Sequence, residues 1–440
     1  MKIWYGNDMK KNTSMPNNKK QKRNKRISPG LTFLLTLSLV LGIGLAAMLV
    51  YSEHADKAVI NSGDWREDIV ETIGYKNDNA FDSSQETNSK EPAEKDSSRY
   101  GAILSDKEYM ESNHIYEKPN KTEGIVTLGF AGDILFDDEY AVMANLLRRG
   151  GSMENGISES LLSKMQDMDI MMINNEFPYT DRGTPTQDKM FTFRADPSTV
   201  NYLDDMGVDI VSVANNHIFD FGEMGLLDTL SILEEKGMPY VGAGRNLEEA
   251  MAPVYFISGD IKIAVVSATQ IERLDNPDTR GATENTAGVF RCWNPEKLYE
   301  VVARAKEDSD FVIVYIHWGT ENVAEPDWAQ LDQAPKLAEA GADLIIGDHP
   351  HCLQGIQYFG KVPVIYSLGN FWFNSKTVDT CLIQVDISEK GIESLQFIPA
   401  IQEGCRTDFA NGEEKERIIS YMNSISYSVT IDSEGFVMPE

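Results

Sequence analysis

Residues 125–133 read IVTLGFAGD, a short apolar run that ends in a glycine and an aspartate. Further apolar runs along the chain follow the same plan and also end in polar residues: MDIMMI (168–173), VDIVSVA (208–214), KIAVVSA (262–268), FVIVYI (311–316) and ADLIIG (342–347). Runs of this length and apolarity are typical of strands that are buried on both faces. They predict the inner strands of an α/β domain.

The segments around these runs indicate how the strands are connected. Amphipathic helical patterns lie between several of them, at 223–236, 295–306 and 327–340. Later in the chain, GIQYFGKVPVIYS carries a Gly-Lys turn between two strands, and TCLIQVDIS followed by GIESLQFIPAI is typical of an antiparallel pair. Mixed sheets, or a sandwich of two sheets, therefore fit better than a purely doubly wound fold.

The composition sets limits on the class of protein. The chain has 440 residues, of which 42% are hydrophobic and 25% are charged, so the bulk of it is able to fold around a core. Four cysteines are too few for a disulfide-built scaffold. Up to two bridges are possible, but we expect none. The net charge of −29 argues against a nucleic-acid binder, which would be basic.

The first 51 residues differ from the rest. Residues 1–30 carry nine Lys and Arg against the single acid Asp8, and LTFLLTLSLVLGIGLAAMLVY (31–51) follows without a charge. About 20 apolar residues span the hydrocarbon core of a bilayer, so we expect 31–51 to be a transmembrane helix. A cleaved signal peptide is the alternative, but both segments are long for one. The positive-inside rule places the basic segment in the cytoplasm and residues 52–440 outside the cell.

We therefore expect a single-pass protein of the cell membrane, with a strongly acidic exterior portion. Its predicted parts are a basic cytoplasmic tail (1–30), a transmembrane helix (31–51), a polar extracellular spacer (52–122), an α/β domain (123–405) and a C-terminal extension (406–440). The spacer is rich in Ser, Asn, Asp and Glu and has little to bury. A short helix is expected within it at 106–116.

Polar residues follow the predicted strands, where binding residues of α/β folds collect. They are Asp133, Glu176, Asn215, Asn216, His217, His317, Asp348, His349 and His351. Four of the six histidines of the chain occupy these positions. A lone histidine after a strand is usually a hydrogen-bonded structural residue, whereas four, joined by carboxylates, indicate a metal site. Imidazole and carboxylate ligands suit Zn, Mn or Fe, and we expect one or two such ions. Cys352 could add a soft ligand, but a packed thiol is the simpler interpretation.

The segments that carry these residues resemble the successive motifs of the bacterial capsule-synthesis protein CapA family, also called the poly-γ-glutamate biosynthesis or PgsA-like family. The motifs are GFAGDILF, NNEFPYTDRG, FRADP, ANNHIFDFG, VYIHWGTE, GDHPHCLQG and YSLGNFWFN, in order from about Val126 to Asn374. That family is related to the calcineurin-like metallophosphatases. The resemblance thus implies a two-sheet αββα sandwich with a two-metal centre at the strand ends.

The resemblance also implies a role for each residue. Asp133 is similar to the first-motif aspartate, Glu176 stands where a carboxylate bridges two metals, and Asn216 would be the amide ligand. His317, His349 and His351 correspond to the metal-binding histidines, and His217 to the non-ligand histidine that protonates the leaving group. Two departures matter. Leu135 replaces a histidine ligand, and Asn175-Glu176 replaces Gly-Asp, so the first metal site lacks one nitrogen.

Several other residues near these motifs are candidates for the substrate site. Arg194 and Lys189 could hold an anionic substrate group, and the alternative for both is a surface ion pair. Trp318 and Trp372 could wall the site or simply pack in the core.

The leading hypothesis is a membrane-anchored extracellular component of poly-γ-glutamate capsule synthesis or export. Partner membrane subunits are implied, because the chain has no GxxxxGK[ST] loop and does not resemble an ATP-driven ligase. Two alternatives stay open. One is a free-standing metal-dependent hydrolase of phosphoester or amide bonds in the envelope. The other is a non-catalytic binding or assembly subunit, which the leucine at position 135 favours.

Overall fold

The computed structural model describes residues 98–271 and 279–440. The predicted cytoplasmic tail, the predicted transmembrane helix and most of the predicted spacer lie outside the described residues. No helix within 98–271 and 279–440 is long and apolar enough to cross a membrane.

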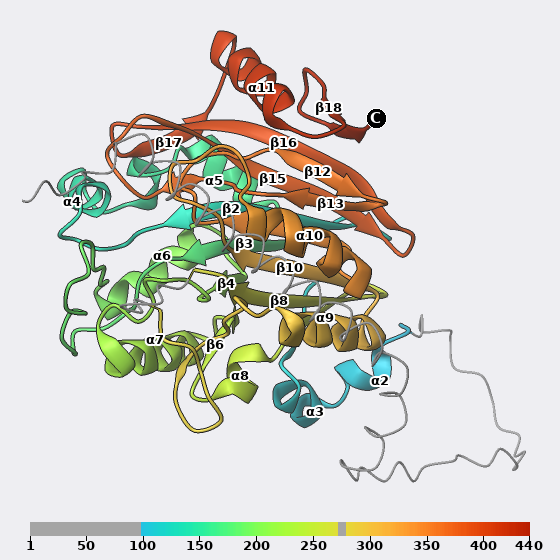
Figure 1. The fold of residues 1–440 in the computed structure, drawn as a ribbon, viewed down its shortest axis with the longest axis horizontal. Coiled ribbons are helices and arrows are strands. Elements are labelled where there is room, and N and C mark those ends of the chain that lie inside the picture. Colours follow the sequence, from blue (N-terminus) through green and yellow to red (C-terminus); the bar gives the residue numbers. More distant parts are fainter. Residues whose placement is uncertain (1–97, 272–278) are drawn as a thin grey trace, which may run out of the picture. The chain divides into compact units, whose positions relative to one another are not determined.

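The described chain is built on two mixed sheets (Figure 1). The eight-stranded sheet contains, in spatial order, β17 (Arg406–Phe409), β16 (Gly391–Glu403), β15 (Val378–Ser388), β2 (Val126–Ile134), β3 (Ile170–Asn175), β4 (Ile210–Ser212) and β5 (Tyr240–Val241), with β14 (Asn370–Trp372) paired to β2. Strands β2 to β5 run parallel, while β15, β16 and β17 form an antiparallel meander on β2.

The seven-stranded sheet has the same mixed character. It contains, in spatial order, β1 (Ile115–Glu117), β7 (Val254–Ser258), β8 (Ile261–Thr269), β10 (Phe311–His317), β11 (Leu344–Asp348), β13 (Val362–Ile365) and β12 (Ile356–Phe359). Strands β8, β10, β11 and β13 are parallel, and hairpins attach β7 and β12 to them. The prediction of mixed sheets is confirmed.

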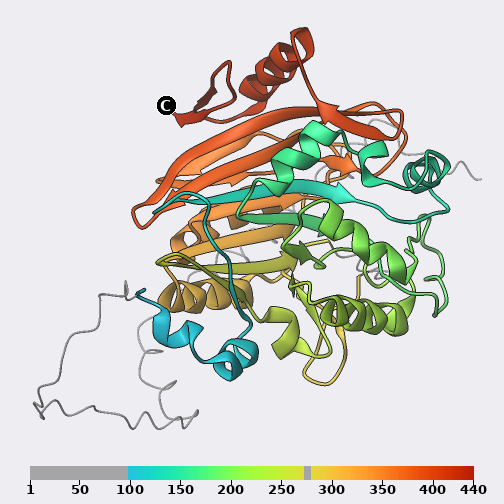
Figure 2. The same cartoon turned by 180° about the vertical axis from the view of Figure 1, so that it is seen from behind.

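Burial patterns show how the sheets are layered. On β10, Phe311, Ile313 and Tyr315 belong to a core that also contains Val126, Leu128 and Phe130 of β2, so this core lies between the sheets. The alternate residues Val312, Val314 and Ile316 pack with helices α9 (Glu296–Asp308) and α10 (Trp328–Ala340). A third core lies under helices α4 (Ala141–Arg148), α5 (Glu159–Gln166) and α7 (Gly222–Lys236) on the far face of the other sheet. Because alternate side chains of a strand point to opposite faces of its sheet, each sheet packs against the other sheet on one face and against helices on the other. The layers are therefore helix, sheet, sheet and helix (Figures 1 and 2).

Capping residues explain where the long helices begin and end. Asp327 caps α10 by accepting from the backbone N–H groups of Ala329 and Gln330, and Gln330 completes a capping box. Gly341 ends the same helix at a positive φ of 116°, and Gly237 ends α7 at a φ of 72°. These helices begin and end within two residues of the ranges predicted from the sequence.

Both ends of the described chain join the sandwich. Strand β1 lies in the range predicted as spacer, and it pairs with β7 after the short helices α2 (Gly101–Leu104) and α3 (Lys107–Ser112). In the range predicted as a C-terminal extension, β17 pairs with β16, and α11 (Glu413–Ile425) packs Ile418 and Met422 into the core between the sheets. The remaining elements are η2 (Met153–Asn155), η3 (Pro197–Asn201), α6 (Tyr202–Asp205), β6 (Ala243–Gly244), α8 (Leu247–Met251), β9 (Gly288–Val289), β18 (Val429–Ile431) and β19 (Val437–Pro439).

Trp372 on β14 is a fully buried residue of the core under α4 and α5. Its Nε1 donates to the carbonyl of Cys405 at 3.2 Å, and its ring lies edge-on to Phe136. We expect Trp372→Ala to lower the free energy of unfolding by about 3–5 kcal/mol, because a large cavity is left. Urea denaturation measures this. Trp328→Ala is the control, because that side chain is 67% exposed and its loss should change stability by about 0.5 kcal/mol or less. Similar losses for both variants would contradict the packing argument.

Candidate metal centre

The carboxyl ends of strands from both sheets meet at one edge of the sandwich. Strand β2 carries Asp133, while Glu176 directly follows β3 and Asn216 with His217 follow β4. From the other sheet, β10 ends at His317, and β11 is followed by His349 and His351. The structure thus brings together all the predicted metal ligands, which lie up to 218 residues apart in the sequence. Apart from His351, which is partly buried, they are almost completely buried.

Local backbone features position the segment that carries Asp133 and the segment that carries His349 and His351. The pairing of β2 with β3 shifts register between Ala131 and Asp133, at Gly132. A Cβ atom on Gly132 would lie 1.9 Å from the carbonyl oxygen of Gly369, so only glycine allows this close approach. His349 and His351 adopt positive φ angles of 93° and 56°. Non-glycine residues in that region cost about 1–3 kcal/mol each and cluster at functional sites.

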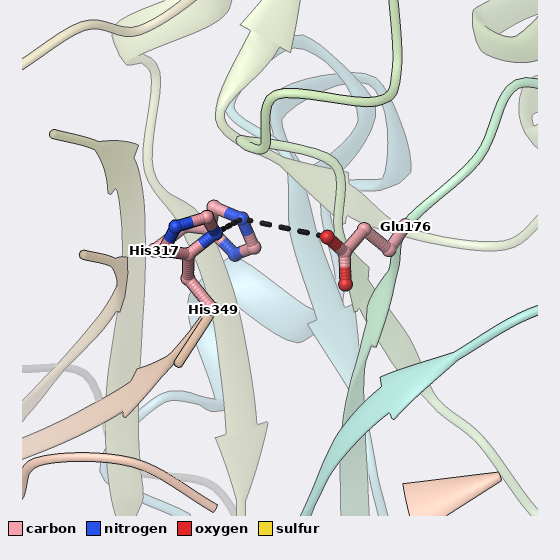
Figure 3. Close-up of side chains that lie close together, drawn as sticks. All are labelled: Glu176, His317 and His349. Carbon is pink, nitrogen blue, oxygen red and sulfur yellow. Dashed lines mark hydrogen bonds and ion pairs between the residues drawn. The ribbon is translucent and has the colours of Figure 1, made fainter. Parts of the chain in front are cut away.

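Three ligand atoms lie around Nε2 of His317, which is itself the fourth ligand atom of the group. Oδ1 of Asn216 lies 2.8 Å from it, and Nδ1 of His349 lies 3.1 Å from it. Oε1 of Glu176 is 3.7 Å from the same nitrogen. Figure 3 shows the two imidazole rings side by side and facing the Glu176 carboxylate. This His-rich group forms the first candidate metal site.

Asp348 orients the histidine at the centre of this group. Its Oδ1 lies 2.8 Å from Nδ1 of His317, so an ionised Asp348 would accept a proton from that nitrogen. Nε2 of His317 is then left without a proton and presents its lone pair to the group of ligands. A carboxylate that fixes a metal-binding histidine in this way is a recurrent feature of metal sites. The sequence placed Asp348 after its strand, but the assignment of ligands did not include it.

A second group shares Glu176 and lies beside the first. Asp133, Glu176 and His351 each offer a ligand atom, and these atoms all lie within 4.8 Å of one another. Oδ2 of Asp133 is 3.0 Å from Nδ1 of His351. Leu135 is fully buried and lines the same cavity as His351. Cys352 does not belong to any candidate ligand group of the described residues.

The residues present fit a divalent cation. Oε1 of Glu176 and Oδ2 of Asp348 are buried without a hydrogen-bond partner. Burial, together with the neighbouring Asp133, raises the pKa of both carboxyls well above the ordinary value. Burial also lowers the pKa of His317 to about 3 and holds that of His349 well below its ordinary value, so both rings are neutral. Neutral imidazoles beside crowded carboxylates are a donor set that a cation would satisfy.

His217 belongs to a separate hydrogen-bonded chain at the edge of the centre. Its Nδ1 lies 2.7 Å from Oδ2 of Asp220, and its Nε2 lies 3.9 Å from Oε1 of Glu176. Nζ of Lys189 is 2.5 Å from the other oxygen of Asp220 and also donates to the backbone carbonyl of Asn216. Burial lowers the pKa of His217 to about 4, so its one proton points to Asp220 and Nε2 faces the ligands. Asp220 was not among the residues singled out from the sequence.

A cavity of about 270 Å³ opens onto the centre. Its lining contains His217, His351 and Asn370 together with aromatic side chains, Glu321 and Lys376. The two predicted substrate-binding residues do not line it. Lys189 is held in its buried ion pair, and the guanidinium of Arg194 stacks on the Phe221 ring with 4.7 Å to the centroid. Trp318 and Trp372 do not line it either; both are buried in the core.

Comparison with known proteins agrees with the motifs. Residues 127–375, more than half of the chain, match the family described as bacterial capsule synthesis protein PGA_cap. The capsule biosynthesis protein CapA of Bacillus anthracis is 32% identical over 241 residues, which make up 52% of this chain and 57% of that protein. The PGA biosynthesis protein CapA of Bacillus subtilis (strain 168) is 29% identical over 286 residues, or 63% of this chain and 72% of that protein. The chain thus spans little more than half the length of the first of these relatives.

Two solved structures that align with much of the chain resemble it only distantly. A 5′-nucleotidase from Candida albicans SC5314 aligns with 64% of this chain and 53% of its own, at 12% identity and a TM-score of 0.35. The protein TT1561 of Thermus thermophilus aligns with 60% of this chain and 95% of its own, at 10% identity and a TM-score of 0.34. Both TM-scores are too low to support a family assignment, so the assignment rests on the sequence match. The chain belongs to the bacterial capsule synthesis protein PGA_cap family.

Proposed function

We propose that this chain is a membrane-anchored, extracellular component of poly-γ-glutamate capsule synthesis or export, and that its metal centre acts on the polymer. Membership of the capsule synthesis family supports the pathway. The basic segment and the apolar run of residues 1–51 support the anchor and its orientation. The observation that carries the metal-dependent part is the convergence of buried ligands from both sheets on Glu176, whose Oε1 has no hydrogen-bond partner.

In this proposal, Glu176, Asn216, His317 and His349 would hold one divalent ion, and Asp133, Glu176 and His351 would hold another. Such ions supply Lewis acidity, which polarises a carbonyl or phosphoryl group and lowers the pKa of water. Asp348, 2.8 Å from Nδ1 of His317, would keep the proton of that ring on Nδ1. Asp220 does the same for His217, so that Nε2 of His217 can accept a proton and then pass it to a leaving group.

Because the protein is negatively charged, an anionic substrate would need a local positive charge at the site. Poly-γ-glutamate is an anion, while this chain carries a net charge of −29, and such charges repel one another over a Debye length of about 8 Å. Lys376 is the basic side chain in the cavity lining, and it is exposed to solvent. Together with bound ions, it would offer the positive charge that a glutamate carboxylate needs. Arg194 could contribute only after moving away from Phe221.

A complementation experiment tests the proposal. In a capsulated Bacillus strain that lacks its own CapA, the wild-type chain is expected to restore surface polyglutamate. A variant with Asp133→Asn, Glu176→Gln, His317→Ala and His349→Ala together is expected to restore less than about one hundredth of it, because both candidate ion sites are removed. Polymer is measured on washed cells, and protein level and membrane location by immunoblot. Full restoration by the fourfold variant would reject the metal-dependent function.

The cavity over the centre favours one alternative, a free-standing hydrolase of envelope phosphoesters or amides. Its 270 Å³ would admit a single phosphoryl or glutamyl group beside His217 and His351. The purified full-length chain would then hydrolyse such compounds with Mn²⁺ or Zn²⁺ and without any other capsule protein. Hydrolysis by the wild type that is lost on addition of a chelator would favour this alternative, and its absence would favour the leading proposal.

A further inference from the structure

The second ion site has three ligands from the predicted set and a gap where the metallophosphatase motif has a histidine. That position is Leu135, whose apolar side chain is fully buried and faces the cavity shared by His351 and Asn370. Leucine offers no lone pair to an ion. A nearby side chain would have to complete the site for it to hold an ion as firmly as the first.

Asn370 is placed next to this gap by the backbone. It is the first residue of β14, and its Cα is in register with that of Asp133 on β2. Immediately before it, the carbonyl of Gly369 accepts from the N–H of Asp133 at 3.2 Å, where Gly132 permits the close approach. The side chain of Asn370 is only 2% exposed. A buried amide is therefore carried to the side of the Asp133 carboxylate.

The atoms around His351 suggest a cation rather than hydrogen bonds alone. Nδ1 of His351 lies 2.8 Å from Oδ1 of Asn370 and 3.0 Å from Oδ2 of Asp133. A ring nitrogen carries at most one proton, so without an ion the two oxygens would have to share a single N–H. Ligand atoms about 3 Å apart are also what adjacent corners of a metal site with bonds of about 2.1 Å would give. One ion would satisfy all three atoms at once.

We propose that the amide oxygen of Asn370 is the fourth protein ligand of the ion held by Asp133, Glu176 and His351, in place of the histidine that Leu135 has replaced. This inference rests on the metal-binding part of the proposed function. It gives the two sites different chemistry. The site around His317 has two imidazole nitrogens, whereas the Asn370 site has three oxygens and a single nitrogen, a set that suits a harder ion such as Mn²⁺ or Mg²⁺.

The test measures metal content and not only activity. The purified full-length chain in detergent is stripped with chelator, reloaded with Mn²⁺ and dialysed, and the bound metal is determined by elemental analysis. Electron paramagnetic resonance then distinguishes a magnetically coupled Mn²⁺ pair from an isolated ion. We expect a coupled pair in the wild type and in Asn370→Asp, which keeps an oxygen ligand. In Asn370→Leu, which has the same number of side-chain heavy atoms but no ligand atom, we expect a single isolated ion.

Two further variants separate a ligand from a structural residue. Asn374→Leu removes an amide at the rim of the same cavity and should leave the coupled pair intact, because Asn374 bonds Gln402 and not a ligand. Adding Leu135→His to the Asn370→Leu chain should restore the second ion, since it returns the missing nitrogen. Retention of the pair by Asn370→Leu, or loss of both its ions, would overturn the inference. A wild type that binds no metal would instead reject the metal-binding proposal itself.

Discussion

Replacing Glu176 by glutamine is expected to abolish high-affinity metal binding and, at the same time, to stabilise the metal-free protein. Affinity should fall by more than about 100-fold, because Glu176 is the one ligand common to both groups, and loss of even an outer partner typically costs 10- to 100-fold. Titration calorimetry with Mn²⁺ or Zn²⁺ on chelator-stripped protein measures this change.

The opposite effect on stability has a separate cause. Without an ion, the Glu176 carboxyl is buried, its pKa is raised by that burial and by Asp133 and Asp348, and its Oε1 has no partner. A neutral amide of the same shape avoids most of this cost, so we expect a gain of about 1–3 kcal/mol in the stripped protein. Thermal unfolding with and without metal shows both effects on one sample.

Asp169→Asn is the matched control for this experiment. Asp169 is also a buried carboxylate beside the eight-stranded sheet, but its oxygens accept from the backbone N–H groups of Lys121 and Thr127. The same chemical change there should destabilise the protein and leave metal affinity unchanged. If Glu176→Gln behaved like Asp169→Asn, Glu176 would not be a metal ligand.

Lys189→Met is expected to lower the free energy of unfolding by about 3–5 kcal/mol, the usual cost of breaking a buried ion pair from one side. The side chains of Lys189 and Asp220 are 6% and 0% exposed, and their charged atoms are 2.5 Å apart. Without the ammonium group, the buried Asp220 carboxylate keeps only the contacts with His217 and with the N–H of Phe193. Urea denaturation measures the loss.

This variant separates two roles for the lysine. From the sequence, Lys189 could either hold an anionic substrate group or form a surface ion pair. The first role would leave stability nearly unchanged and weaken binding. Lys376→Met provides the comparison, because Lys376 is exposed and lines the cavity. Its loss should change stability by about 0.5 kcal/mol or less. Equal and small effects of the two substitutions on unfolding would support the substrate-binding prediction for Lys189.

The sequence predicts the inner strands and long helices well because their signals are local. Apolar runs mark β2, β10 and β11, and the long helices α7 and α10 end at residues with a clear physical role, Gly237 and Gly341. Edge elements carry no such signal. The tripeptide IYE of β1 becomes a strand only because β7 offers it an edge, and the amphipathic α11 gives no hint of which core it covers.

The residues of the site also fall into those that the sequence could assign and those that it could not. Carboxylates and histidines at strand ends could be assigned from spacing and motif, since parallel strands bring their carboxyl ends to one edge. The supporting residues could not be assigned. Asp348 orients His317, Asp220 orients His217, and Asn370 reaches His351 across from another strand. Their roles depend on the direction of side chains in three dimensions. Asp348 follows a predicted strand and precedes His349, and Asp220 lies three residues after His217, but neither position indicates which ring the carboxylate contacts.

The ligands come from both layers of the sandwich, and this has a mechanical consequence. Backbone hydrogen bonds join strands within a sheet, but the two sheets are held to each other mainly by the apolar core between them. An ion bound by Glu176 and Asn216 from one layer and by His317 and His349 from the other would be a removable cross-link between the layers. Like a disulfide, it would close a very long loop of chain. The concentration of available metal would then determine how strongly the two sheets are held together.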